Sequence, residues 1–84
     1  MPEIVMYASA WCPYCRAARA LLDRKGASYT VLDVDAQPDL WDEILRRSGR
    51  DTVPQTFIGE HHVGGYDDMV ALDRRGELDR LLSG

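Results

Sequence analysis

A Cys-Pro-Tyr-Cys segment carries the most evident chemistry of this sequence. Cys12 and Cys15 are the only two cysteines of the chain. Pro13 suits the first turn of a helix, where its missing N–H would have no partner anyway. Residues three apart at a helix start lie on one face, within the reach of a disulfide. The segment therefore predicts a redox-active dithiol.

The two cysteines are predicted to have different roles. Cys12 would occupy the cap position, where free N–H groups and the positive end of the helix dipole favour a thiolate. The dipole contributes only about 0.3–1 kcal/mol, so hydrogen bonds to the sulfur or a cation such as Arg16 must add to it. Cys15 would lie inside the first turn and be less exposed. We therefore expect Cys12 to attack a disulfide and Cys15 to resolve the product.

The cysteines have two other possible interpretations. Free cysteines are often unreactive core residues. A metal site with His61 and His62 is a second alternative, but neighbouring residues of a strand point to opposite faces and cannot readily hold one ion. We therefore predict no metal site, with one histidine exposed and the other half-buried.

A second candidate segment, Thr52-Val53-Pro54, precedes a predicted strand. A proline at a strand start removes one ladder donor and needs no functional explanation. A cis Val53–Pro54 peptide would instead expose the Val53 backbone, which could pair with an extended peptide. The residues alone leave both interpretations open and favour the ordinary trans bond.

A glycine-rich turn, Gly64-Gly65-Tyr66-Asp67-Asp68, precedes the last helical segment. Glycines let a ligand approach the backbone, and the N–H groups of a helix start suit a carboxylate. Asp67 could bind the ammonium group of a ligand. Alternatively, Asp67 or Asp68 caps the helix, which by itself would explain the residue type.

The elements that position these segments can be predicted from hydrophobic periodicity and from Gly and Pro. Strands are predicted over residues 3–7, 29–34, 55–58 and 61–63. Helices are predicted over residues 13–25, from Pro38 to Gly49, and over residues 67–75. The second helix would turn Leu40, Trp41, Ile44 and Leu45 inward, and one more helical turn would pack Leu78, Leu81 and Leu82 on the protein.

The element order predicts the topology. The first β-α-β unit requires a parallel, right-handed crossover, and the last two strands form an antiparallel hairpin. We predict a thioredoxin-like α/β fold, with a mixed four-stranded sheet (β-α-β-α-β-β-α) and helices on both faces. The 84 residues suit one domain over residues 1–84.

Charge, hydropathy and cysteine content argue against several classes of protein. The net charge of −4 argues against a nucleic-acid or anionic-membrane surface. The start of the chain lacks the pattern of a signal peptide, and its apolar runs are far shorter than the ~20 residues that span a bilayer. A secreted disulfide scaffold would carry more cysteines, spread over longer loops. We therefore expect a cytoplasmic protein, with a monomer as the default.

Taken together, the motifs resemble the glutaredoxin family, specifically its bacterial-type dithiol class. The similarity covers nearly the whole chain: VMY at residues 5–7, CPYC at 12–15, TVPQTFI at 52–58 and GGYDD at 64–68. It implies a glutathione-binding groove and favours a cis bond at Pro54. By similarity the groove comprises Cys12, Tyr14, Thr52, Val53, Pro54, Gly65, Tyr66 and Asp67.

The resemblance also implies the reaction and the way glutathione binds. Cys12 and Cys15 would reduce protein disulfides and glutathionylated proteins, with ribonucleotide reductase as a plausible recipient of electrons. Glutathione would be a co-substrate, with no tightly bound cofactor. Its cysteinyl backbone would pair with Val53, and the turn at residues 65–67 would hold its γ-glutamyl end.

The sequence departs from many relatives, which carry a lysine shortly before the active site. This chain has Ala8 and Ser9 there. Arg16, Arg46 or Arg50 would then have to face the glycyl carboxylate of glutathione, and the sequence does not decide among them.

Two alternative functions accompany this interpretation. Some glutaredoxins bind an iron–sulfur cluster between two copies, with thiolate ligands from the first cysteine and from glutathione. Pro13 stiffens this site and Cys15 can close on Cys12, which disfavours a cluster. A thioredoxin-type protein reduced by a flavoprotein reductase is the other alternative. The Trp11 that precedes Cys12 is similar to the thioredoxin pattern, but the central Pro-Tyr and the GGYDD turn are not.

Overall fold

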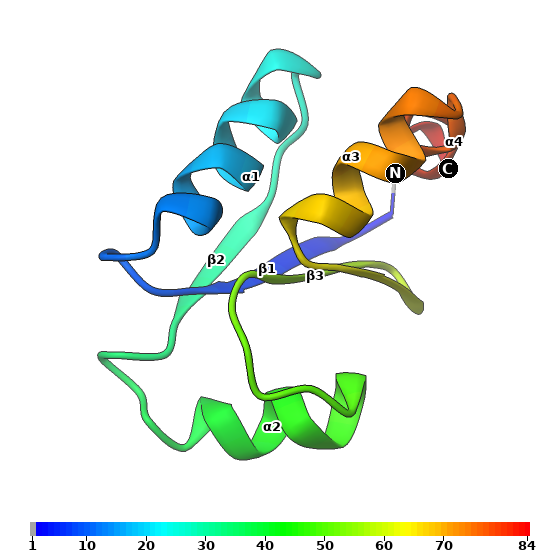
Figure 1. Cartoon of the computed structure of the whole chain (residues 1–84). Helices are drawn as coiled ribbons and strands as arrows, with labels where there is room; N and C mark the ends of the chain where they lie inside the picture. The colour runs from blue at the N-terminus through cyan, green and yellow to red at the C-terminus, as the bar shows by residue number, and fades with distance from the viewer. Residues whose placement is uncertain (1) are drawn as a thin grey trace.

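The computed structural model of the chain describes residues 2–84, in which a four-stranded sheet lies between helices on its two faces (Figure 1). The strands are β1 (Ile4–Ala8), β2 (Thr30–Asp33), β3 (Gln55–Ile58) and β4 (His61–Gly64), and their order in the sheet is β2-β1-β3-β4. β1 pairs in parallel with β2, whereas the β1–β3 and β3–β4 pairs are antiparallel. The predicted thioredoxin-like mixed sheet is confirmed.

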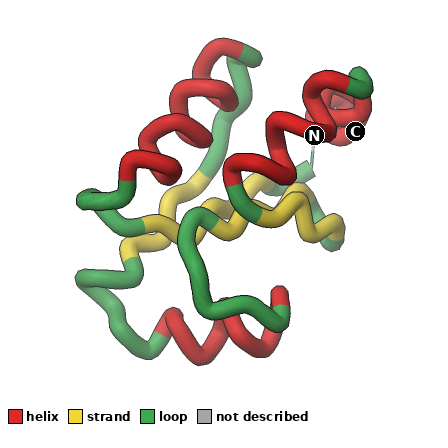
Figure 2. The backbone as a smooth tube through the Cα atoms, viewed as in Figure 1, coloured by secondary structure: helices red, strands yellow, loops and turns green. Residues whose placement is uncertain are grey.

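Four helices cover the sheet unequally. They are α1 (Pro13–Arg24), α2 (Leu40–Ser48), α3 (Tyr66–Arg74) and α4 (Glu77–Ser83). α1, α3 and α4 lie on one face, and α2 lies alone on the other (Figure 1). The chain must therefore return from α2 to the sheet, and the loop that does so passes the edge where α1 begins (Figure 2).

The sheet separates two hydrophobic clusters because successive side chains of a strand point to opposite faces. Met6 of β1 joins the cluster beneath α1 and α3, where Leu22 is fully buried. Its neighbour Tyr7 joins the cluster beneath α2, together with Phe57 and Ile44. Burying one such large apolar side chain contributes about 1.5–3 kcal/mol relative to leaving it exposed. The two clusters fix both helical layers against the one sheet.

The helix ends follow the local sequence closely, with two corrections at α2. Gly49 ends α2 in the left-handed conformation, with φ 72°, as predicted. However, α2 begins at Leu40 and not at Pro38, which lies in a preceding turn. The prediction that Leu45 faces inward is wrong, because that side chain is 54% exposed. Helical rotation of about 100° per residue carries it away from the sheet once Ile44 is buried.

The end of the chain forms more helix than the single turn predicted. α4 runs over seven residues, and its side chain Leu78 is fully buried in the hydrophobic core.

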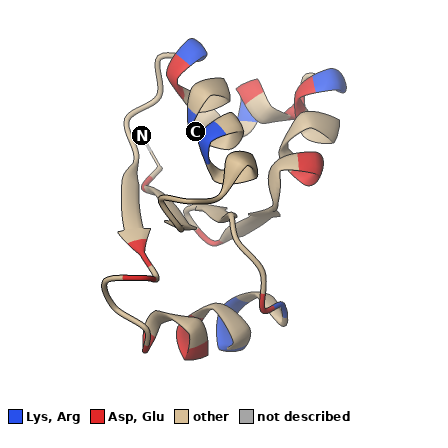
Figure 3. Ribbon diagram, turned by 60° about the vertical axis from the view of Figure 1, so that its left-hand side comes forward, with Lys and Arg blue, Asp and Glu red and all other residues tan. Residues whose placement is uncertain are grey.

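Charged residues of both signs lie on the helices on both sides of the sheet (Figure 3). In α2, acidic residues occupy the first turn and Arg46 and Arg47 the last, an order that complements the helix dipole. Within residues 2–84, no helix is long and apolar enough to cross a membrane.

Candidate active site

Cys12 is the N-cap residue of α1, as the sequence predicts. Its backbone is extended, with φ −91° and ψ 115°, and its Sγ accepts a hydrogen bond from the backbone N–H of Cys15 at 3.3 Å. A cap side chain normally offers oxygen to this N–H; here it offers sulfur. The bond and the helix dipole both stabilise negative charge on Sγ. The Cys12 thiol also donates to the carbonyl of Val53, at 3.7 Å.

Cys15 is buried, and its burial affects its acidity. It is 1% exposed, whereas Cys12 is partly exposed. Burial raises the pKa of the Cys15 thiol to about 12, with a further increase from its hydrogen bond to the Cys12 side chain. Cys15 is therefore a thiol at neutral pH, and Cys12 is the cysteine that solvent and reagents reach.

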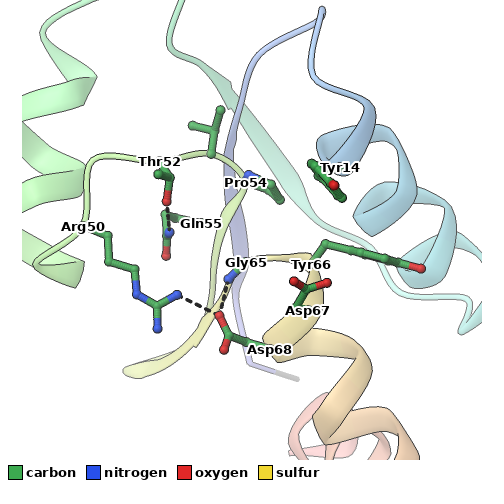
Figure 4. Close-up of a pocket in the computed structure, with 10 residues that line it drawn as sticks. Tyr14, Arg50, Thr52, Pro54, Gln55, Gly65, Tyr66, Asp67 and Asp68 are labelled. Carbon is green, nitrogen blue, oxygen red and sulfur yellow. Dashed lines mark hydrogen bonds and ion pairs between the residues drawn. The ribbon is translucent and has the colours of Figure 1, made fainter.

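A groove of about 200 Å³ lies beside the dithiol and is built from three segments distant in sequence. They are the first turn of α1, the loop before β3 and the start of α3 (Figure 4). The groove is lined by Tyr14, Arg50, Thr52, Val53, Pro54, Gln55, Gly65, Tyr66, Asp67 and Asp68. Seven of the eight residues that the family resemblance places in the groove are among them, and Cys12 is the exception. Cys12 is not a lining residue and adjoins the groove through Val53.

Two tyrosines and a cis peptide shape the groove. The rings of Tyr14 and Tyr66 lie 6.5 Å apart between centroids and are tilted by 35°. Tyr14 is 62% exposed, so its ring is available to a ligand. The Val53–Pro54 peptide is cis, which is the isomer that the family resemblance favours and that the residues alone did not.

The turn before α3 assigns different positions to its two aspartates. The Asp68 carboxylate accepts hydrogen bonds from Gly65 N–H at 2.9 Å and from Arg50 Nη1 at 2.7 Å. The Arg50 hydrogen bond, followed by that of Gly65, lowers the pKa of Asp68. Asp68 is thus the capping residue, while Asp67 is exposed on the groove. Gly64 has φ 103°, and any side chain there would collide with the Asp68 carboxylate.

The structure separates the three candidate arginines. Arg50 lines the groove, and Arg16 and Arg46 do not. Arg50 reaches it because Gly49 ends α2 just before and turns the chain. Gln55 and Asp68 also line the groove. Neither was predicted to do so, although Asp68 belongs to the glycine-rich turn singled out from the sequence. The only available signal was a polar Gln in an otherwise buried strand.

The two histidines lie as predicted. His61 is exposed and His62 is partly buried, where its Nε2 lies 2.7 Å from Gln55 Oε1. Neither takes part in a cluster with the cysteines. No group of three or more His, Cys, Asp or Glu side chains in residues 2–84 could hold a metal ion.

A dithiol whose outer sulfur caps a helix at the edge of a thioredoxin-like sheet defines a thiol–disulfide oxidoreductase. Comparison with known proteins specifies which kind. The sequence model of the family "Glutaredoxin" matches residues 4–63. The chain belongs to the glutaredoxin family, and it is a glutathione-dependent thiol–disulfide oxidoreductase.

Curated relatives match along almost their whole length. A glutaredoxin of Pseudomonas aeruginosa is 53% identical over 99% of this chain and 99% of its own. Glutaredoxin 3 of Escherichia coli is 49% identical over 98% of this chain and 99% of its own. These bacterial relatives support the bacterial-type assignment.

Solved structures agree with the fold. The buckwheat glutaredoxin–glutathione complex superposes with a TM-score of 0.91 at 32% identity, covering 98% of this chain and 77% of that one. The solution structure of a glutaredoxin from Brucella melitensis gives a TM-score of 0.86 at 51% identity, covering 98% and 89%.

The difference between the two thiols predicts the order of alkylation. Burial raises the pKa of Cys15 to about 12, so very little of this side chain is a thiolate at pH 7. Iodoacetamide should therefore modify Cys12 at least about tenfold faster than Cys15, and Cys15 labelling should increase as the pH rises toward that pKa. Peptide mass mapping at short reaction times measures both. Faster labelling of Cys15 at pH 7 would contradict the assignment.

Proposed function

We propose that Cys12 is the nucleophile and Cys15 the resolving cysteine of this oxidoreductase, with glutathione as the reductant. The observation that carries the proposal is the hydrogen bond from Cys15 N–H to Cys12 Sγ at 3.3 Å. It stabilises the thiolate that attacks, and it does so again when Cys12 Sγ is the leaving group of its own mixed disulfide.

The first half of the reaction is an exchange of one disulfide for another. The Cys12 thiolate attacks one sulfur of a substrate disulfide, the substrate S–S bond breaks, and the departing thiolate takes a proton. When the substrate is a protein disulfide, Cys15 then loses its proton and attacks Cys12 Sγ. This step forms the Cys12–Cys15 disulfide and releases the reduced protein. Two glutathione molecules restore the dithiol and leave as glutathione disulfide.

For glutathionylated substrates the second half needs only glutathione. Cys12 takes the glutathione moiety, and a second glutathione attacks the mixed disulfide at the glutathione sulfur. The high pKa of Cys15, caused mainly by burial, keeps that thiol protonated and limits its competing attack. The buried resolving thiol therefore favours the glutathione route on such substrates.

The groove is the proposed glutathione site. The Val53 backbone would pair with the cysteinyl unit, as an added strand does, with Tyr14, Thr52 and Pro54 around it. Gly65, Tyr66 and Asp67 would hold the γ-glutamyl end, where helix-start N–H groups suit a carboxylate and Asp67 suits the ammonium group. The similarity to a glutaredoxin solved in complex with glutathione supports this placement.

Arg50 is the proposed positive partner of a glutathione carboxylate. Of the three arginines considered from the sequence, it alone lines the groove. Its Nη1 is held by Asp68 at 2.7 Å, which orients the guanidinium. An arginine has five N–H donors, so the bond to Asp68 leaves others for a ligand.

The physiological setting follows from the family. We propose protein disulfides and glutathionylated proteins as substrates, in a reducing compartment such as the cytoplasm. Ribonucleotide reductase is a candidate recipient of electrons on the resemblance alone.

Cysteine variants test the proposed roles. The assay is the reduction of a small glutathione mixed disulfide, coupled to glutathione reductase and NADPH. In this assay the activity of Cys12→Ser should be lower than that of the native protein by about a hundredfold or more. Cys15→Ser should stay within about threefold of the native protein, because glutathione replaces the resolving thiol. An inactive native protein with both thiols reduced would contradict the function, and an active Cys12→Ser would contradict the roles.

Arginine variants test the groove. Arg50→Met should raise the KM for glutathione by up to about fivefold, the range of an exposed ion pair, and the increase should shrink at high salt. Arg46→Met removes the same charge from α2, away from the groove, and serves as the matched control. Equal effects of the two substitutions would assign the change to net charge and contradict a specific contact.

A further inference from the structure

A chain of hydrogen bonds connects β4 to the groove. His62 Nε2 lies 2.7 Å from Gln55 Oε1, and Gln55 Nε2 donates to Thr52 Oγ1 at 3.2 Å. Gln55 is 1% exposed, so its amide has no access to bulk water. Thr52, in contrast, is exposed and lines the groove, with its hydroxyl directed at Gln55 (Figure 4).

The orientation of the Gln55 amide sets the direction of each bond in this chain. Gln55 turns its amide oxygen to His62, and an amide oxygen only accepts, so in this arrangement His62 Nε2 carries a hydrogen. An amide nitrogen only donates, so Thr52 Oγ1 accepts from Gln55. A hydroxyl that accepts one hydrogen bond keeps its own hydrogen to donate elsewhere. When His62 donates to Gln55 and Gln55 donates to Thr52, the Thr52 hydroxyl can therefore donate its own hydrogen toward the groove.

The surroundings of His62 fix the position of its ring and favour its uncharged form. Its ring stacks on Phe57, with centroids 4.9 Å apart and an interplanar angle of 26°. Burial, and next the charge of Arg50, lower the pKa of His62. The remaining charged or titratable groups that act on its pKa are Asp68, His61 and Arg47. At neutral pH the ring is therefore uncharged and carries a single N–H, whose position decides the direction of the whole chain.

We propose that His62 is a positioning residue that acts through Gln55 and makes the Thr52 hydroxyl a hydrogen-bond donor to an acceptor oxygen of glutathione. The inference rests on the proposed glutathione groove. If the hydrogen were on Nδ1, His62 Nε2 would accept, the Gln55 amide would reverse, and Thr52 would donate to Gln55. Only lone pairs would then face the carbonyl and carboxylate oxygens of the ligand.

The first test examines the native, reduced protein without ligand. Long-range ¹H–¹⁵N correlation NMR at pH 7.5 distinguishes the two tautomers of a neutral histidine. We expect the Nε2–H form at His62. The Nδ1–H form would overturn the proposal, and this outcome would not depend on glutathione activity.

The second test is a double-mutant cycle. His62→Phe keeps an aromatic ring against Phe57 and removes the donor. We expect it to raise the KM for glutathione by about two- to tenfold, the range of one hydrogen bond, with little change in kcat. Thr52→Val should have a similar effect, and the double variant should be no worse than Thr52→Val alone.

Matched controls separate this role from a structural one. His61→Phe makes the same change at the neighbouring exposed histidine and should leave KM unchanged. Thr52→Ser keeps the hydroxyl and should reverse most of the KM increase caused by Thr52→Val. Alkylation of Cys12 by iodoacetamide should be the same in all of these proteins, since that reaction does not use the groove. If Thr52→Val raises KM and His62→Phe does not, or if the two effects simply add, the proposal is overturned. Absence of activity in the native protein would instead overturn the proposed function.

Discussion

One short contact organises this molecule: the backbone N–H of Cys15 points at the sulfur of Cys12. It requires α1 to begin at Pro13, directly after Cys12, and it requires Cys12 to be extended rather than helical. The same turn of helix then places Cys15 inward, where burial raises its pKa. Solvent access and stabilisation of negative charge belong to the sulfur of Cys12, and burial belongs to that of Cys15, because Cys12 caps the helix and Cys15 lies within it.

The rest of the fold places a groove beside that sulfur, where we propose that glutathione binds. The central position of β1 in the sheet places the start of α1 at the end of β1, next to the start of β3. α2 lies on the opposite face, so the segment that leads back into β3 must cross this edge and carries Val53 to within 3.7 Å of Cys12 Sγ. The start of α3 closes the groove from the third side, and the Arg50–Asp68 pair joins it to the crossing loop. A groove assembled in this way depends on three elements at once.

Much of this could be predicted from local sequence, because the decisive signals are local. Pro13 marks the start of α1, Gly49 ends α2, and the Ile, Val and Tyr residues of β1 are typical of a strand. Apart from the start of α2 and the length of α4, the features that escaped prediction depend on tertiary contacts. Leu45 fits an apolar helical face by spacing, but the sheet buries Ile44 and leaves Leu45 in solvent. The Arg50–Asp68 pair spans 18 positions and the His62–Gln55 contact crosses a hairpin, so neither has a signature in the sequence. The cis bond at Pro54 was favoured only through the family resemblance.

We propose that the groove beside Cys12 receives glutathione along Val53 and the start of α3. An amide ¹H–¹⁵N NMR comparison of the Cys15→Ser protein before and after glutathione is attached to Cys12 tests this placement. We expect the largest shift changes at Val53, Gly65, Tyr66 and Asp67, in addition to Cys12 and its immediate neighbours. Changes confined to α1, or centred on α2 or α4, would show that the glutathione moiety lies elsewhere and that the groove is not its site.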